Sequence, residues 1–310
     1  MFEAAFPVTH PSVSGSSATR TANMHSATAA NLLKRSSIEL STNGEQAIRG
    51  ASEVLPAGMA VYTPKMPRET LDDKLRQLQL LKKYGFNPIP HIVARQLESQ
   101  LQLHDFLADA VNTAGVHRVL VIGGDGNEPV GPYRDSAAVI AGGVLQEFGI
   151  TAVDVAGYPD GHPIISTQTL LRDLQQKVDL AARQNLDLSV VTQFSFDPKS
   201  VARYCAELAK QVPGVPVYAG LAGPTSPAKL LRFARVCGVS TSMRAANKLG
   251  RNALRLATHS SPDEQFELLV SETAAGAAGN LAGFHLFSFG GFVDSSNWLD
   301  ARARIAGLGS

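Results

Sequence analysis

The run VLVIGG at Val119–Gly124 decides the fold class of this 310-residue chain. It is continuously apolar and ends with two glycines, which is typical of a parallel strand covered by helices on both faces. An antiparallel sandwich would alternate apolar and polar residues more regularly. Outward from this run, short β-rich segments alternate with helix-period segments from residue 36 onward. This alternation is the pattern of βα units around a parallel sheet.

Eight strand-like runs follow one another, and eight is the strand number of a (β/α)8 barrel. We expect strands at Ser37–Leu40, Met59–Thr63, Ile89–Ala94, Arg118–Gly123, Ala152–Ala156, Leu188–Phe194, Val215–Gly220 and Phe284–Phe289. Helices are expected at Leu71–Tyr84, Leu97–Thr113, Ser136–Gln146, Thr169–Gln184 and Pro198–Lys210, with two or three more between Ser226 and Ala278 that break at Gly238 and Gly250.

An open doubly wound sheet would produce the same alternation of strands and helices. Its GxGxxG fingerprint is missing, because Gly123–Asn127 reads GGDGN. The sequence therefore predicts an α/β fold with a single (β/α)8 TIM barrel domain over residues 36–310.

The first 35 residues are rich in Ser, Thr and Ala and lack the apolar core of a secretory signal. Residues 1–35 are therefore expected to be a disordered extension, or a segment upstream of a true start at Met24. A transit peptide is the alternative.

Composition favours small-molecule chemistry in the cytoplasm. Lys+Arg 28 against Asp+Glu 27 leaves a formal charge of +1, which offers no basic field for nucleic acid or an anionic membrane. No run reaches the ~18–20 apolar residues that span a bilayer. Cys205 and Cys237 have no CxxC spacing and are expected to be buried thiols in a reducing compartment. No metal motif is present, and a homo-oligomer remains open.

Polar residues recur where the expected strands end, which is where barrel enzymes place their chemistry. These residues are Glu39, Thr63, Lys65, His91, Arg95, Asp125, Tyr158, Asp160, His162, Gln193, His285 and Ser288. Each also has a structural explanation. Glu39 can form a salt bridge, Asp125 can cap a turn, His162 can be a loop residue without a role, and His91 and His285 can fill polar corners. Gln193 needs hydrogen-bond partners from the protein or a ligand.

Several of these segments resemble the methylenetetrahydrofolate reductase family. GYPDGHP at 157–163 resembles the family loop A-x-Y-P-x-x-H-P, and VTQFSFD at 191–197 resembles I-T-Q-F-F-F-D, so that Tyr158, His162, Gln193 and Asp197 match. GGD at Gly123–Asp125 resembles the family's R-G-D, and SIELS resembles the opening strand that carries its acidic residue, here Glu39. The likeness runs in order from about residue 36 to about residue 290.

The resemblance implies a reductase that converts 5,10-methylenetetrahydrofolate to 5-methyltetrahydrofolate with NADH or NADPH, in one-carbon metabolism such as methionine biosynthesis. It gives Glu39 the role of general acid and Asp125 the stabilisation of a cationic intermediate. Gln193 and Asp125 would bind the folate substrate. Two other functions remain open: a folate-dependent one-carbon or methyl-transfer barrel enzyme or lyase, and a non-catalytic folate-binding protein.

The resemblance places cofactor contacts on Thr63, His91, Tyr158, His162, Asp173 and Lys177. FAD is possible, but the family's diphosphate contacts are weakened here. Gly123 and Gln176 replace two arginines, and Asp173 replaces an asparagine. A flavin-free branch of the family transfers hydride directly from nicotinamide to folate, and this chain fits either branch.

Overall fold

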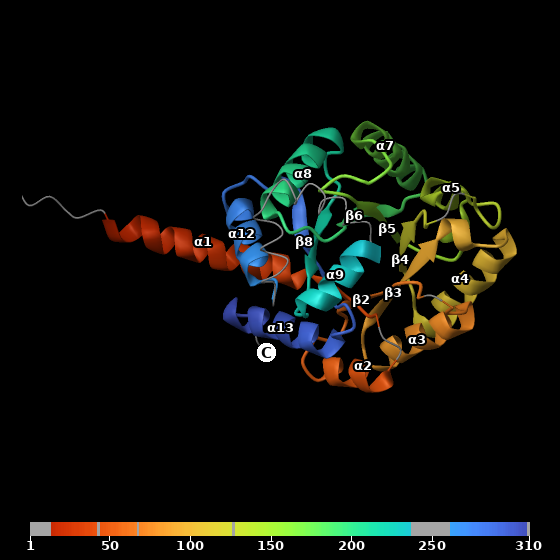
Figure 1. The fold of residues 1–310 in the computed structure, drawn as a ribbon, viewed down its shortest axis with the longest axis horizontal. Coiled ribbons are helices and arrows are strands. Elements are labelled where there is room, and N and C mark those ends of the chain that lie inside the picture. The colour runs from red at the N-terminus through yellow and green to blue at the C-terminus, as the bar shows by residue number, and fades with distance from the viewer. Residues whose placement is uncertain (1–13, 42–43, 67, 126–127, 237–260, 309–310) are drawn as a thin grey trace, which may run out of the picture.

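Eight parallel strands form a closed barrel in the order β1 to β8, and β8 pairs with β1 to complete it. The structure is a computed structural model that describes residues 14–41, 44–66, 68–125, 128–236 and 261–308. Helices surround the strands, as Figure 1 shows. The predicted single-domain (β/α)8 barrel is confirmed.

The strands lie within three residues of their predicted bounds. They are β1 (Ser37–Glu39), β2 (Ala60–Thr63), β3 (Asn87–Val93), β4 (Arg118–Ile122), β5 (Ala152–Gly157), β6 (Asp187–Thr192), β7 (Val217–Ala222) and β8 (Leu281–Phe287). The helices are α1 (Ser14–Lys34), α2 (Glu45–Ser52), α3 (Leu71–Lys83), η1 (Ala94–Gln96), α4 (Gln100–Ala114), α5 (Ser136–Ala141), α6 (Val144–Glu147), α7 (Thr167–Arg183), α8 (Pro198–Gln211), α9 (Pro227–Val236), α12 (Asp263–Ala274) and α13 (Phe292–Ile305).

Local signals explain where several helices begin and end. Thr70 caps α3 in a capping box with Asp73, and Ser99 caps α4. The helix predicted at Ser136–Gln146 is wrong as one element. It divides into α5 and α6 at Gly142 and Gly143, where Gly143 has a φ of 76° that a helix interior does not allow. The helix breaks predicted at Gly238 and Gly250 lie outside the described residues, and so does Cys237.

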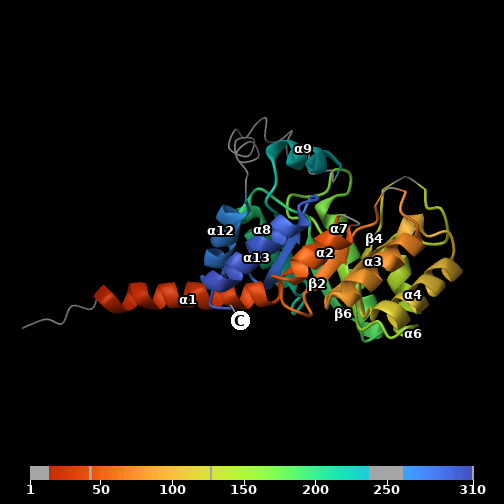
Figure 2. The same cartoon turned by 90° about the horizontal axis from the view of Figure 1, so that it is seen from below.

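Helix α1 corrects the expectation of disorder for residues 14–35, whereas residues 1–13 lie outside the described residues. Its described side chains Ala29, Leu32 and Leu33 are buried, and Ser36 ties the chain to β8 by accepting the Phe284 amide. Figure 2 shows that α1 crosses the end of the barrel opposite α9, while its N-terminal part projects outward. Tertiary packing of these side chains stabilises the Ser- and Ala-rich helix, and composition alone did not reveal it.

Residues on alternate positions of the strands fill the barrel interior. Tyr62, Ile89, Leu120 and Val191 form a cluster there, separate from the larger core between strands and helices. Buried Cys205 belongs to that outer core, and burial raises the pKa of its thiol to about 12. None of the helices in the described ranges is both long and apolar enough to cross a membrane.

Asp154 is a fully buried carboxylate inside the barrel. It accepts hydrogen bonds from the Tyr62 hydroxyl at 2.7 Å, the Arg118 guanidinium at 2.8 Å and the Ser189 hydroxyl. Burial, and then the negative charge of Asp154, raises the pKa of Tyr62 well above its usual value, so this hydroxyl remains a donor. The network joins β2, β4, β5 and β6 below the polar groups at the barrel mouth.

Asp154→Ala should destabilise the fold by about 3 kcal/mol, because it leaves Arg118 and Tyr62 without their buried acceptor. Urea unfolding measures the loss. Asp300→Ala is the matched control, since its ion pair with Arg304 at 2.9 Å is at the surface and should contribute no more than about 0.5 kcal/mol. Equal stabilities of the two variants would show that the interior network contributes nothing.

Candidate active site at the carboxyl ends of the strands

Glu39 lies at the end of β1 and faces the barrel interior. Its neighbour Ile38 belongs to the outer core, so the alternation of the strand turns Ser37 and Glu39 inward. The Glu39 side chain is 11% exposed, and its Oε2 lies 3.9 Å from Nε2 of His285 on β8. A carboxyl group in this position is shielded from bulk water and still open to the mouth of the barrel.

His285 is held in place by Ser37. The Ser37 hydroxyl lies 2.9 Å from Nδ1 of His285, while the buried Nε2 has no hydrogen-bond partner among the described residues. If Ser37 donates to Nδ1, the neutral ring carries its proton on Nε2, on the side of Glu39. The rings of Tyr62 and Phe287 pack edge-on against His285 at centroid distances of 4.7 and 4.8 Å, which fixes its plane.

His91 extends this group to β3. Its ring lies 6.2 Å from that of Tyr62, and its Nε2 is buried without a hydrogen-bond partner in the described part of the chain. Burial lowers the pKa of His91 well below its usual value, and His285 and Lys74 lower it further. His91 is therefore neutral and available as a hydrogen-bond donor or acceptor.

Asp125, Tyr158 and His162 form a second group, on the connections after β4 and β5. The rings of Tyr158 and His162 meet edge-on at 4.9 Å. Burial raises the pKa of Tyr158 and lowers that of His162, and the charge of Asp125 acts on both. The His162 Nδ1 accepts the Ile164 and Ile165 amides at 3.3 and 3.2 Å, so the neutral ring presents an Nε2 donor.

Two glycines and a tyrosine shape this second group. Gly124 has a φ of 87°, and a Cβ there would lie 2.4 Å from the Val93 side chain, so Asp125 follows a turn that requires glycine. Gly157 leaves room for Tyr204, whose hydroxyl bonds to the backbone of Tyr158. Tyr204 is a positioning residue that sequence reasoning missed.

Gln193 continues the inward side of β6 after Ser189 and Val191. Its amide oxygen accepts the Phe194 amide at 3.1 Å, and its own backbone amide donates to Gly157 at 2.8 Å. An aromatic wall adjoins it, made of Phe194, Phe196, Phe233, Phe287 and Phe289. Asp197, which matches the same family motif, caps α8 by accepting the Lys199 amide.

Three of the predicted cofactor contacts lie away from these groups. Thr63 lies on the side of β2 that faces the helices, together with Val61, and its buried Oγ1 has no partner in the described ranges. Asp173 and Lys177 lie on α7. Burial lowers the pKa of Lys177, and the charges of Asp173 and Asp135 oppose that change.

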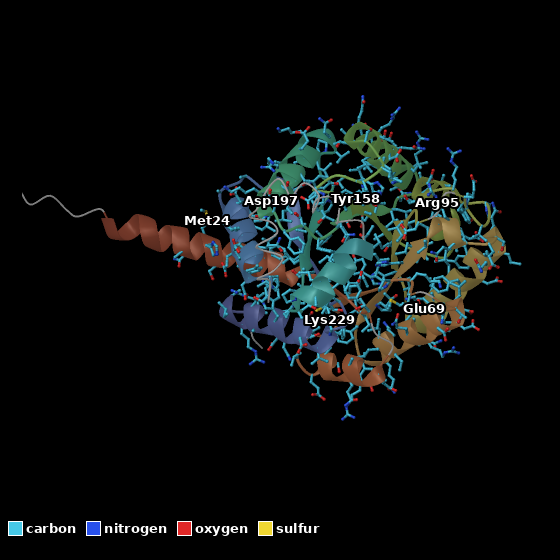
Figure 3. The ribbon with its side chains drawn as sticks, viewed as in Figure 1. Met24, Glu69, Arg95, Tyr158, Asp197 and Lys229 are labelled. Atoms are coloured by element: carbon cyan, nitrogen blue, oxygen red, sulfur yellow. The ribbon has the colours of Figure 1, made fainter. Side chains whose placement is uncertain are left out.

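The structure adds Lys74 and Glu69, which the sequence analysis did not select. Figure 3 labels Glu69, Arg95 and Tyr158, which come from the connections after β2, β3 and β5. Lys74 is 1% exposed and pairs with Glu69 at 3.1 Å. A signal was present, because Lys74 lies on the same helical stripe as the buried residues Leu78 and Leu81.

The fold and site define a (β/α)8 barrel with ionisable groups gathered at the carboxyl ends of its strands, which is the architecture of barrel enzymes. The sequence model of methylenetetrahydrofolate reductase matches residues 48–253. The chain therefore belongs to the methylenetetrahydrofolate reductase family, whose membership supports a reductase-like oxidoreductase function in folate one-carbon metabolism. Glu39 precedes the matched region, so its place in the site rests on the geometry.

Solved structures similar to this chain are two forms of sialic acid aldolase from Ruminococcus gnavus and N-acetylneuraminate lyase from Fusobacterium nucleatum in complex with pyruvate. The wild-type aldolase has 12% identity and a TM-score of 0.39, with 66% of this chain and 65% of the aldolase covered. The lyase has 9% identity and a TM-score of 0.43, covering 86% and 70%. The aldolase catalytic lysine mutant has 11% identity and a TM-score of 0.45, covering 88% and 74%. The chain thus spans about two thirds of the wild-type aldolase, and these weak similarities support no functional argument.

Asp125→Asn should lower the pKa of His162 further, because it removes the negative charge that favours the imidazolium. Proton NMR titration of the His162 ring measures the change. Asp105→Asn, which removes a carboxylate beside His104 instead, should leave His162 unmoved. An unchanged pKa of His162 in Asp125→Asn would show that the charge of Asp125 does not act on His162.

Proposed function

We propose that this chain reduces 5,10-methylenetetrahydrofolate to 5-methyltetrahydrofolate with NADH or NADPH as hydride donor. One observation carries the proposal: the nearly buried Glu39 carboxyl group faces the barrel mouth beside His285. Family membership supports the class of substrate. The fold alone would also suit a methyl-transfer enzyme or a lyase.

Glu39 suits the first chemical step. The methylene carbon bridges two nitrogens in a five-membered ring, and it accepts hydride poorly until one carbon–nitrogen bond opens to an iminium. Opening requires a proton on the departing nitrogen, which a shielded carboxylic acid can supply. His285 restricts the carboxyl group from one side, so the proton is delivered from a defined position.

Asp125 and Gln193 suit the binding of the pterin ring. Gln193 has donors and an acceptor on one planar amide, which matches the alternating edge of a pterin. Asp125 carries a negative charge that would favour a cationic iminium electrostatically. The aromatic wall from Phe194 to Phe289 would limit access of water to that intermediate.

The positions expected to hold a flavin diphosphate do not fit that group. Gly123 offers no side chain, and the positive charge of Lys177 is opposed by Asp173 and Asp135. Lys177 with Asp173 and Asp135 carries a formal charge of −1. A diphosphate instead needs cationic or donor-rich contacts. We therefore favour direct hydride transfer from the nicotinamide to the folate. Tyr158 and His162 would line the site that holds the nicotinamide.

Glu39→Gln should retain folate binding and lose at least about 100-fold in turnover, because the amide cannot protonate the leaving nitrogen. NADH and NADPH oxidation with methylenetetrahydrofolate is the assay. Glu53→Gln is the control, since Glu53 is an exposed surface residue. Full turnover in Glu39→Gln would remove this residue from the mechanism, and no nucleotide oxidation by the unaltered protein would favour the transferase or lyase.

Direct transfer predicts a colourless purified protein without a flavin band between about 350 and 500 nm. Both substrates must then be bound to the protein at the same time. The lines of a double-reciprocal plot of initial rates, drawn at several concentrations of the second substrate, should therefore intersect. Added FAD should not raise the rate. A flavin spectrum with FAD-dependent turnover and parallel initial-rate lines would contradict direct transfer and retain the reductase assignment.

A further inference from the structure

Serine side chains bridge β1 and β8 on both sides of Glu39. Before it in the chain, the Ser37 hydroxyl lies 2.9 Å from Nδ1 of His285. After it, the Ser41 hydroxyl lies 3.1 Å from the hydroxyl of Ser288. These two contacts hold the backbone around Glu39 against β8. Any adjustment between Glu39 and β8 must therefore come from the Glu39 side chain.

One neutral form of the His285 ring satisfies Ser37, and the other does not. Ser37 is 3% exposed, and its hydroxyl has no other hydrogen-bond partner in the described part of the chain. Nδ1 can accept the hydroxyl hydrogen only when that nitrogen carries no proton, so the neutral ring then carries its hydrogen on Nε2. In the opposite form the Ser37 hydrogen would be buried without an acceptor, which costs free energy.

The Nε2 hydrogen of this form lies beside the Glu39 carboxyl group. Nε2 of His285 is 3.9 Å from Oε2 of Glu39, which is about 1 Å longer than a charge-assisted hydrogen bond. The rings of Tyr62 and Phe287 pack against both sides of the histidine, which is 1% exposed. The carboxyl group lies at the open mouth, so a movement of its side chain closes the gap.

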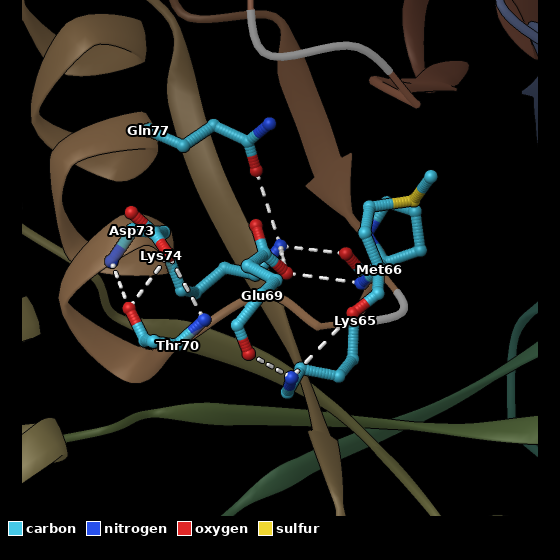
Figure 4. Close-up of polar contacts among 8 residues, drawn as sticks. Lys65, Met66, Glu69, Thr70, Asp73, Lys74 and Gln77 are labelled. Atoms are coloured by element: carbon cyan, nitrogen blue, oxygen red, sulfur yellow. Dashed lines mark hydrogen bonds and ion pairs between the residues drawn. The ribbon is translucent and has the colours of Figure 1, made fainter.

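Lys74, the buried cation on α3, is already engaged by other groups. Its ammonium group pairs with Glu69 at 3.1 Å and donates to the Pro64 carbonyl at 2.6 Å. It also donates to the Gln77 amide oxygen at 3.1 Å, as Figure 4 shows. These three contacts use the three ammonium hydrogens. The lysine therefore has no hydrogen left for the acid on β1.

We propose that Ser37 and His285 are positioning residues for Glu39. Ser37 holds His285 in the tautomer whose Nε2–H donates to the Glu39 carboxylate that forms as the acid gives up its proton. This inference rests on the proposed function, in which Glu39 is the general acid. It adds to that function a donor that acts on the acid after the proton has left.

The proton step balances without a change in the protonation of His285. The Glu39 proton bonds to the lone pair of the departing nitrogen, and the electron pair of the broken carbon–nitrogen bond stays on that nitrogen. Glu39 keeps the electron pair of its broken O–H bond and becomes a carboxylate. The carboxylate then accepts the Nε2–H, which stabilises the new negative charge. Glu39 regains a proton from solvent at the mouth.

Ser37→Ala should lower turnover about 10-fold and change the KM for folate little, because the lost contact forms only as the proton leaves. Ser37→Thr keeps the hydroxyl and should keep turnover. Ser36→Ala is the matched control, since Ser36 also joins β1 to β8 but does so by accepting the Phe284 amide at 3.2 Å. It should lower the unfolding temperature and leave turnover unchanged.

Nitrogen-15 NMR of the ligand-free protein at about pH 9, above the ordinary pKa of histidine, tests the contact without turnover. The His285 ring is assigned by the loss of its signals in His285→Gln. We expect its hydrogen on Nε2, with a proton signal that moves upfield in Glu39→Gln because a charge-assisted hydrogen bond weakens. Ser37→Ala should give a mixture of tautomers, and Ser36→Ala should leave the ring unchanged.

A ring with its hydrogen on Nδ1 overturns the inference, and so does an Nε2–H signal that is the same in Glu39→Gln. Equal losses of turnover in Ser37→Ala and Ser36→Ala also overturn it, because a purely structural contact between the strands would not distinguish the two serines. If Ser37→Ala fails to fold, the tautomer and its dependence on Glu39 still decide. An unaltered protein that oxidises no nucleotide rejects the proposed function, whereas the NMR result separately decides the contact.

Discussion

The hydrogen bonds between β1 and β8 close the barrel, and the site depends on that closure. Ser37 and His285 are 248 positions apart in the chain, yet they are register partners across this seam. The same pairing places Glu39 opposite Phe287. An open sheet would leave β1 and β8 at opposite edges, and Glu39 would then lack both the shielding and the neighbouring histidine that its proposed role requires.

Closure also explains why polar residues can occupy the interior. Asp154 is surrounded by donors from three other strands, and each donor arrives from a different direction around the barrel. A buried carboxylate needs such a set of partners to offset its desolvation. The network occupies the lower part of the barrel. In the upper part, the Nε2 atoms of His91 and His285 have no hydrogen-bond partner among the residues that the structure describes. The histidine nitrogens at the mouth can therefore bind a ligand, whereas the polar groups around Asp154 already bind one another.

Charge at the mouth is arranged in two groups with different properties. Near β1, β3 and β8 the ionisable side chains are enclosed, and the Lys74–Glu69 pair on the α3 side is buried as well. Near β4 and β5, Asp125 is exposed and acts on the more buried Tyr158 and His162. The proposed reaction would use such a division, because proton transfer requires shielding and a large bipartite substrate requires access.

The sequence by itself determined the eight strands, the barrel and the order of the motifs, because strand patterning and motif spacing are local properties of the chain. It also selected Glu39, Asp125, Tyr158, His162 and Gln193 from their positions after strands. Only the tertiary structure decided which of these residues meet, because contacts such as His285 with Glu39 join opposite ends of the chain. It also placed Thr63 on the helix side, ordered α1 through burial of Leu32 and Leu33, and buried Lys74 against Glu69. Those outcomes depend on packing and desolvation, which a linear pattern does not specify.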